Sequence, residues 1–366
     1  MYRNDNRIVI TLDAGGTNFV FSAMRGYDFI IEPITYPSNA QDLDLCLQTM
    51  LRGFREVIAK LNEKPVAVSF AFPGPADYRR GIIGGYLPNF PSFRDGVALG
   101  PFLERELNLP VYINNDGDLF ALGEAKGGML PEINHRVKEL GGKQTYTNLL
   151  GYTFGTGFGI GSVINGQLNQ GNNCCIETFC LPNKRMPGII AEEGVAIRAI
   201  KREYARLSGT TDPSLEPYDI FRIAEGEKEG DADAAREAFA LFGREAGNAM
   251  AIAVSLTDSL VVIGGGLTGA SKYILPSLLD EMRSTLKTID GQDVQRVQMR
   301  VFDLDDELEF AKFVVGDSRP LKVYGSDETV TYNPMKRTGV MLSKLGASKA
   351  IPIGAYTYAL STIDAM

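Results

Sequence analysis

The sequence predicts an α/β protein of two domains. Its 366 residues exceed the usual length of one domain. Short apolar, β-branched runs alternate along the chain with segments whose apolar residues repeat at helical spacing. A strand, a glycine turn and a second strand over residues 8–24 partly recur over residues 148–164. This recurrence indicates a duplicated unit.

The first hairpin pattern is the most informative stretch of the chain. A buried strand ends at Asp13, residues 14–18 form a polar, glycine-bearing turn, and residues 19–24 form a second strand. A turn between two strands differs from the glycine turn that opens a helix in dinucleotide-binding folds. It offers backbone N–H groups and hydroxyls to an anion, and Asp13 is placed to hold Mg²⁺ through water. An ordinary hairpin is the alternative.

The remaining elements follow in order. Before residue 100 the patterns predict a third extended stretch at 29–36, a helix within 43–61 and a strand at 65–72 that breaks at 73–77. Between residues 100 and 130 they predict a helix at 101–108, a strand at 110–114 and a helix from 119 that ends at 126–128. After the second hairpin they predict helices at 193–207, 217–225 and 232–256, a buried strand at 259–263, a helix at 271–288 and a last helix at 350–363. Residues 303–345 are polar, which favours a solvated excursion with short strands over a functional element.

Composition excludes several classes of function. The net charge of −8 argues against a nucleic-acid or anionic-membrane partner. No apolar run approaches the roughly 20 residues that span a bilayer, and the first residues carry no signal-peptide core, so we expect a cytoplasmic protein. Four cysteines, three of them within residues 174–180, do not form a disulfide framework. The single histidine, His135, is predicted in a surface loop.

Three glycine turns after strands, together with one carboxylate at a strand-to-helix junction, suit phosphoryl transfer. That reaction needs positioned phosphates, Mg²⁺ and a base for the attacking hydroxyl. Asp116 is the candidate base, because it leaves a strand end where a carboxylate faces a cleft. The alternative for Asp116 is an N-cap of the helix that begins near Leu119.

Six motifs in order resemble the ROK family of sugar kinases and sugar-responsive repressors, which has the hexokinase/actin-like ATPase fold. They are Asp13-Ala-Gly-Gly-Thr-Asn, Phe72-Pro-Gly-Pro-Ala-Asp, Pro88-Asn89, Asn115-Asp-Gly-Asp with Ala121-Leu-Gly-Glu, Gly155-Thr-Gly with Asn165-Gly, and Ile263-Gly-Gly-Gly. The resemblance implies a ribonuclease H-like, actin-like fold with mixed five-stranded sheets flanked by helices and a cleft between the domains. It implies an N-terminal domain at 1–118, joined by the C-terminal helix at about 350–366, and a larger domain at 119–349.

The resemblance also implies an ATP-dependent sugar kinase with Mg²⁺, acting on a hexose or N-acetylhexosamine, and a homodimer. Asp116 would take the proton of the attacking hydroxyl, and Asp13 would support Mg²⁺ through water. The sugar would be bound by Asn89, Asn115, Asp116, Glu177 and Cys180. The nucleotide would be bound by Asp13, Gly15, Gly16, Thr17, Asn18, Gly155, Thr156, Gly157, Gly265 and Gly266.

The chain departs from the family where the sugar and a structural zinc are usually bound. Glu177 stands for the family glutamate, but Cys180 falls where a histidine is expected, and the family's C-x-C-G-x-x-G-C-x-E spacing does not follow. Adjacent cysteines fit a tetrahedral site poorly, so we expect no structural zinc, and we expect Cys174, Cys175 and Cys180 to pack as small apolar groups.

Two rival functions remain. One is a catalytically degenerate sugar sensor without a DNA-binding domain, which the altered sugar motif favours. A repressor is disfavoured, because the first phosphate loop at Asp13 leaves no room for a preceding helix-turn-helix. A nicotinamide oxidoreductase is disfavoured too, since no glycine turn has the G-x-G-x-x-G spacing between a strand and a helix.

Overall fold

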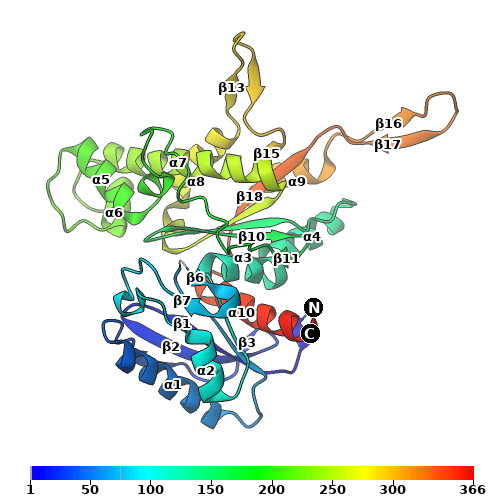
Figure 1. Ribbon diagram of the computed structural model, residues 1–366. Coiled ribbons are helices and arrows are strands. Elements are labelled where there is room, and N and C mark those ends of the chain that lie inside the picture. The colour runs from blue at the N-terminus through cyan, green and yellow to red at the C-terminus, as the bar shows by residue number, and fades with distance from the viewer. Residues whose placement is uncertain (1, 75) are drawn as a thin grey trace. The chain divides into compact units, whose positions relative to one another are not determined.

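The computed structural model describes residues 2–74 and 76–366 (Figure 1). Pro75, which belongs to the Phe72–Asp77 motif, lies outside the described residues. The chain divides into two compact units. The first comprises Met1–Pro131, Ile160–Ile176 and Lys344–Met366, and the second comprises Glu132–Gly159 and Glu177–Ser343. The C-terminal segment therefore belongs with the N-terminal part of the chain.

The first unit contains a mixed sheet in which β1 is central. Its strands are β1 (Val9–Ala14), β2 (Asn18–Arg25), β3 (Asp28–Phe29), β4 (Ile34–Pro37), β5 (Ala67–Ala71) and β8 (Val111–Asn114). The strand order is β3-β2-β1-β5-β8, with β4 paired to β2. The predicted hairpin is confirmed, because β1 pairs antiparallel with β2 from Val9↔Met24 to Ala14↔Phe19. The sheet has six strands where five were expected. The single stretch predicted at 29–36 is two strands, separated by a segment with Pro33, which has no N–H to give to a ladder.

The α-helices of this unit lie where the sequence predicts helices. They are α1 (Leu43–Lys60), α2 (Leu99–Leu107), α3 (Asp116–Gly127) and α10 (Ala347–Asp364), with short 3₁₀ turns η1 (Tyr2–Asn4), η2 (Tyr78–Arg80) and η3 (Pro91–Phe93) and a small ribbon of β6 (Ala76–Asp77) and β7 (Ile82–Ile83). Helix α1 buries Cys46, Met50, Phe54 and Val57, a stripe at three- and four-residue spacing that faces the sheet. Asp42 caps it through the N–H of Leu45.

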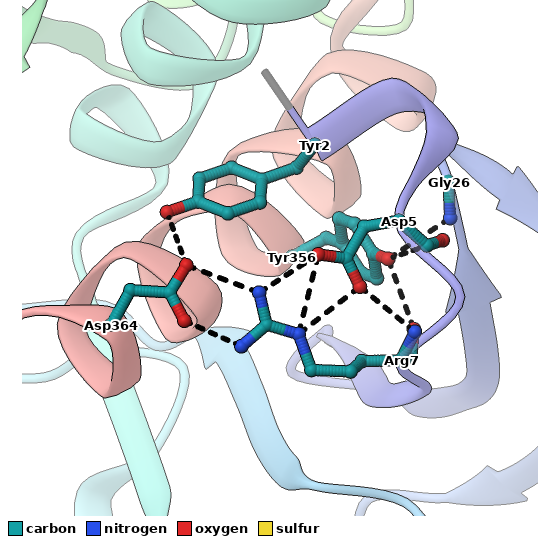
Figure 2. A network of polar contacts seen from close by, with 6 residues as sticks. All are labelled: Tyr2, Asp5, Arg7, Gly26, Tyr356 and Asp364. Atoms are coloured by element: carbon teal, nitrogen blue, oxygen red, sulfur yellow. Dashed lines mark hydrogen bonds and ion pairs between the residues drawn. The ribbon is translucent and has the colours of Figure 1, made fainter.

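A polar network joins the two ends of the chain within this unit (Figure 2). The Arg7 guanidinium reaches Asp364 at 2.6 Å and Asp5 at 2.8 Å, and Tyr2 donates to Asp364 at 2.9 Å. Tyr356 Oη accepts from the N–H of Gly26 at 3.0 Å and lies 2.9 Å from the carbonyl oxygen of Arg7. These contacts hold α10 against the segment that leads into β1.

The second sheet also has six strands where five were expected, in the order β11-β10-β9-β12-β18-β15. Its strands are β9 (Leu149–Phe154), β10 (Phe158–Ile164), β11 (Gln167–Leu168), β12 (Leu260–Gly264), β15 (Arg300–Asp303) and β18 (Arg337–Leu342). Strand β12 runs parallel to β9 and β18, and β15 runs parallel to β18. The expectation that 303–345 is a solvated excursion is wrong for β18, which is a core strand, and for helix α9 (Glu307–Val315). A short apolar run among polar residues hid this strand.

The other elements are helices α4 (Met129–Glu139), α5 (Ile197–Ser208), α6 (Pro217–Glu225), α7 (Ala232–Thr257) and α8 (Ser271–Met282), the 3₁₀ turns η4 (Ala191–Gly194) and η5 (Gly266–Ala270), and two ribbons. The ribbons pair β13 (Thr285–Lys287) with β14 (Asp293–Gln295) and β16 (Arg319–Lys322) with β17 (Thr329–Tyr332), and both project from the second unit (Figure 1).

Two local predictions need correction. The helix expected over 271–288 ends at Met282, and residues 285–287 begin a ribbon instead. His135 is exposed as expected, but it lies in α4 and not in a loop, where it pairs with Glu139 at 3.2 Å. Among the described residues, no helix is long and apolar enough to cross a membrane.

Candidate active site

Three parallel strands of the first unit place acidic and amide groups at one edge of the sheet. Asp13 on β1 is in register with Ala71 on β5, and Ala71 is in register with Asn114 on β8. The carboxyl ends of parallel strands meet at the same edge, where α/β proteins bind their ligands. Neighbouring strands are about 4.8 Å apart, so the Cα atoms of Asp13 and Asn114 are about 10 Å apart. Asp116 follows Asn114 by two residues at this edge.

The first glycine turn is held in place by its own backbone and by Ser38. The N–H of Gly15 donates to the carbonyl oxygen of Asn18 at 3.0 Å, and the N–H of Ser38 donates to the carbonyl oxygen of Thr17 at 2.9 Å. A Cβ added to Gly16 would lie 2.9 Å from the Cβ of Asn89. The structure therefore brings the turn together with Asn89, which sequence alone placed 73 positions further along the chain.

Asp116 occupies the first position of helix α3, and Asn115 is the N-cap. The N–H of Gly117 lies 2.8 Å from Oδ1 of Asn115 and 2.8 Å from Oδ1 of Asp116. The N-cap interpretation of Asp116 is therefore wrong. A Cβ on Gly117 would lie 2.4 Å from the carbonyl oxygen of Ile160, so only glycine lets the start of α3 pack this closely.

Desolvation by the surrounding protein raises the pKa of Asp116, and the carboxylate of Asp13 raises it further, against a smaller lowering by hydrogen bonds. Desolvation also raises the pKa of Asp13. Both side chains still reach solvent. Two carboxylates with weakened hydration at one sheet edge favour both proton acceptance and cation binding.

Sequence reasoning missed Asp118 and Gln170 beside this edge. Asp118 is only 8% exposed, and burial raises its pKa to about 7, with a further increase from Asp116. Gln170 Nε2 donates to Asn114 Oδ1 at 2.6 Å. The sequence feature that could have pointed to Asp118 is the block Asn115-Asp-Gly-Asp118. The ROK family pattern that this block resembles has asparagine at the fourth position.

The cysteines behave differently from one another. Cys174 packs against the core of the first unit, and burial raises the pKa of its thiol. Cys175 and Cys180 are exposed, so the expectation that they pack as apolar groups is wrong. The Cys175 thiol instead lies 3.1 Å from the carbonyl oxygen of Asn173. This local contact could not be predicted from the composition.

In the second unit, the turn Gly155–Gly157 follows β9 and is supported by Glu192 and Arg198. Glu192 Oε2 accepts from the N–H of Phe158 at 3.0 Å, and Arg198 pairs with Glu192 at 2.8 Å. Arg198 Nη1 also donates to the carbonyl oxygen of Thr156 at 3.2 Å. Sequence reasoning missed Arg198. In the structure Glu192 orders the glycine turn.

Gly265 and Gly266 lie at the end of the neighbouring strand β12, where Gly264 is in register with Thr153 of β9. Gly265 has φ of +95°, and a Cβ there would lie 2.3 Å from the carbonyl oxygen of Phe154. Gly266 has open space around its Cβ position. The structure therefore brings two of the three predicted phosphate and adenosine turns together at adjacent strand ends.

Glu177 and Cys180 are at the start of the loop that precedes η4 in the second unit. Glu177 is half-buried, and Cys180 is exposed. Thr178, between them, is buried. Desolvation raises the pKa of the fully buried Tyr152, and Glu177 contributes to that increase.

The described residues fit Mg²⁺ and do not fit a structural zinc. Asp13 is an accessible carboxylate, and desolvation is what raises its pKa. Such a carboxylate suits a hydrated Mg²⁺. For zinc, no group of three or more His, Cys, Asp or Glu side chains suitable for a metal occurs among residues 2–74 and 76–366. The loop after Cys180 offers no thiolate or imidazole, the donors that structural zinc requires.

The chain is similar to several known sugar kinases. The family model for the ROK family matches residues 9–178. The crystal structure of a glucokinase from Parabacteroides distasonis ATCC 8503 is similar with a TM-score of 0.90 and 54% identity, covering 99% of each chain. A β-glucoside kinase from Listeria monocytogenes is 26% identical over 221 residues, covering 58% of this chain and 68% of its own. A ROK family glucokinase from Streptomyces griseus, in complex with glucose and AMPPNP, has a TM-score of 0.61 at 17% identity, covering 96% and 98% of the chains.

The fold and the two strand edges define a protein of the actin-like ATPase class, the fold shared by ROK sugar kinases. The predicted fold class is thereby confirmed. The chain belongs to the ROK family.

Proposed function

We propose that this chain is an ATP-dependent sugar kinase that transfers the γ-phosphate of ATP to a hydroxyl of a hexose or N-acetylhexosamine. The observation that carries the proposal is the position of Asp116 at the sheet edge beside Asp13, with a raised pKa. Glucose is the first substrate to test, because the relative at 54% identity is a glucokinase. The β-glucoside kinase among the relatives makes a glucoside the second.

The chemistry asks little of the protein beyond positioning and one base. Asn89 and Asn115 would hydrogen-bond the sugar hydroxyls, and Glu177 would be a further sugar ligand. Asp116 would accept the proton of the attacking sugar hydroxyl. The oxygen of that hydroxyl would bond to the γ-phosphorus as the bond to ADP breaks and ADP leaves. A carboxylate with a raised pKa is a better base than an ordinary aspartate.

The turns at Gly15–Asn18 and Gly155–Gly157 would offer backbone N–H groups to the phosphates, with the side chains of Thr17 and Thr156 as further donors. Gly265 and Gly266 would let adenosine approach the end of β12 closely. Asp13 would hold Mg²⁺ through water, and that ion neutralises charge on the phosphates when it is bound.

The test is ADP release from Mg-ATP across glucose, its epimers, N-acetylhexosamines and β-glucosides, with Asp116→Asn as the matched variant. Turnover on one sugar that disappears in Asp116→Asn supports the kinase. Absence of turnover on every sugar, while one sugar still raises the melting temperature, would support the alternative of a sugar sensor that has lost catalysis.

A further inference from the structure

We infer that the loop at residues 178–194, which we name the clasp, is a metal-free element held by buried carboxylates, and that Lys184, Glu245 and Glu281 are positioning residues for the second glycine turn and Glu177. The inference rests on the proposed function where it concerns turnover. Its structural part stands on contacts within the second unit alone.

The clasp folds back on itself as a short two-stranded element. Pro182 forms an isolated antiparallel bridge with Ile190. Around that bridge, the N–H of Ala191 donates to the carbonyl oxygen of Leu181 at 2.7 Å, and the N–H of Asn183 donates to that of Ile189 at 2.8 Å. These bonds make the two arms of the clasp move together.

The tip of the clasp is anchored to helices α7 and α8 by carboxylates. Lys184 Nζ lies 2.7 Å from Oε1 of Glu281, and the backbone N–H of Lys184 lies 3.1 Å from Oε1 of Glu245. Glu281 is 7% exposed and Glu245 is 2% exposed. Asn183, also 2% exposed, turns the tip by accepting the N–H groups of Arg185 and Met186 at 3.0 Å each.

The anchoring carboxylates have further partners that fix them. Arg296 pairs with Glu281 at 3.3 Å and is itself 10% exposed. Arg185, next to Lys184, pairs with Glu203 at 3.3 Å. A buried carboxylate without a partner is unfavourable in free energy. These cations and N–H groups therefore hold the clasp in one position.

The other end of the clasp reaches the candidate nucleotide turn. The N–H of Glu192 donates to the carbonyl oxygen of Phe179 at 3.1 Å. The Glu192 side chain then accepts the N–H of Phe158, which directly follows Gly157. The chain of contacts therefore runs from Glu281 through Lys184 and the two clasp arms to the Gly155–Gly157 turn, and Glu177 immediately precedes the clasp.

These contacts fix the loop as a structural metal would, but they do so through ion pairs and hydrogen bonds. A zinc site would fix a loop through several thiolates and imidazoles, and the clasp contains one cysteine, Cys180, and no histidine. The clasp is fixed through one lysine and two buried carboxylates on neighbouring helices. The structure therefore assigns the family's zinc-loop position to an ion-pair anchor in this chain.

The first experiment measures metal dependence without any assay of turnover. The full chain, expressed with added zinc, is analysed for bound zinc and for melting temperature before and after EDTA treatment. We expect far less than one zinc per chain and an unchanged melting temperature. One zinc per chain, with a lower melting temperature after EDTA, would overturn the inference even if the kinase proposal holds.

The second experiment tests positioning with Lys184→Met, Lys184→Arg as the conservative variant, and Lys322→Met as a control that breaks the exposed Lys322–Asp327 pair. Amide hydrogen exchange should become faster in residues 178–194 of Lys184→Met, while β9 and β12 keep their protection. On the substrate found for the wild type, KM for sugar or ATP should rise about tenfold with a smaller change in kcat, because small misplacements can cost up to about 100-fold. Lys184→Arg and Lys322→Met should resemble the wild type.

The two proposals fail in different ways. A wild type without turnover on any sugar contradicts the proposed function, and hydrogen exchange and zinc content still decide the clasp. An active wild type whose Lys184→Met variant keeps both its exchange rates and its KM values overturns the clasp alone.

Discussion

Asp13 and Asp116 lie at the same edge of one sheet, and the charge on Asp13 opposes ionisation of the Asp116 carboxyl. Asp13 ends the in-register row that runs through Ala71 to Asn114, and Asp116 begins the helix that follows. Desolvation raises the pKa of both, and the charge on Asp13 adds to the increase at Asp116. The proposed base and the proposed cation site would thus be coupled, because a cation at Asp13 would lower the pKa of Asp116.

Asp116→Asn should abolish turnover and leave sugar binding largely intact. Asparagine keeps the shape and a hydrogen-bonding oxygen but cannot accept the proton. In the wild type, the acid limb of the rate should lie above the ordinary aspartate value of 3.8. Steady-state kinetics against pH and calorimetric sugar titration measure the two effects. Asp95→Asn, at an exposed position of the same unit, is the control. Loss of sugar binding with the rate per bound sugar unchanged would contradict the role.

Asp118→Asn should stabilise the protein at alkaline pH. The folded chain keeps a proton on Asp118 up to about pH 7, whereas the unfolded chain loses it near pH 3.8. Stability from this group is therefore complete at low pH and is lost as the pH rises toward 7. At about 1.4 kcal/mol per pKa unit, the free energy of unfolding of the variant at pH 8 should exceed that of the wild type by at most about 4 kcal/mol.

Urea unfolding at pH 5 and pH 8 measures this difference, with the exposed Asp280→Asn as the control. The gain for Asp118→Asn should be larger at pH 8. Equal gains at the two pH values would show that Asp118 is ionised throughout in the folded chain.

Tyr356→Phe should destabilise the first unit through lost hydrogen bonds and not through lost packing. The ring is fully buried, and its hydroxyl serves the N–H of Gly26 and the carbonyl oxygen of Arg7 (Figure 2). Removing it leaves these backbone groups unpaired, which costs about 1–3 kcal/mol. Denaturant unfolding of this variant and of Tyr218→Phe, whose residue is 71% exposed, provides the comparison. Equal midpoints would indicate that other groups replace the hydroxyl.

Much of the fold was predictable because periodicity reports local burial. The hairpin at β1–β2 and the helices α1 and α6 have clear apolar patterns, and the structure confirms them. Strand β18 was not predictable, because pairing with β12 and β15 decides its burial and its own run is short. The β13–β14 ribbon was read as a continuation of α8 for a related reason, since its residues are exposed and carry no periodic signal.

The candidate site divides in the same way. Asp13, Asp116 and the glycine turns could be proposed as site residues from the sequence, because their residue types and order are unusual. Arg198 and Gln170 were missed because nothing local distinguishes them. They became visible only through contacts, Arg198 with the Thr156 carbonyl and Gln170 with Asn114. The roles proposed for all the site residues, including Asp13, Asp116 and the glycine turns, stay predictions.

Gly265→Ala and Gly266→Ala should separate the folding role of the third glycine turn from its nucleotide role. Gly265 has φ of +95°, and an added Cβ would lie 2.3 Å from the carbonyl oxygen of Phe154 and 2.7 Å from its backbone nitrogen. Backbone atoms cannot move aside without a large cost in free energy, so Gly265→Ala should lower the melting temperature and weaken ATP binding together.

At Gly266 the Cβ position is open, so Gly266→Ala should keep the melting temperature. If adenosine approaches this strand end closely, Gly266→Ala should still raise the dissociation constant for ATP about tenfold, which corresponds to about 1.4 kcal/mol. Thermal unfolding and nucleotide titration of both variants provide the measurement. Unchanged ATP affinity in Gly266→Ala would place adenosine elsewhere than at the end of β12.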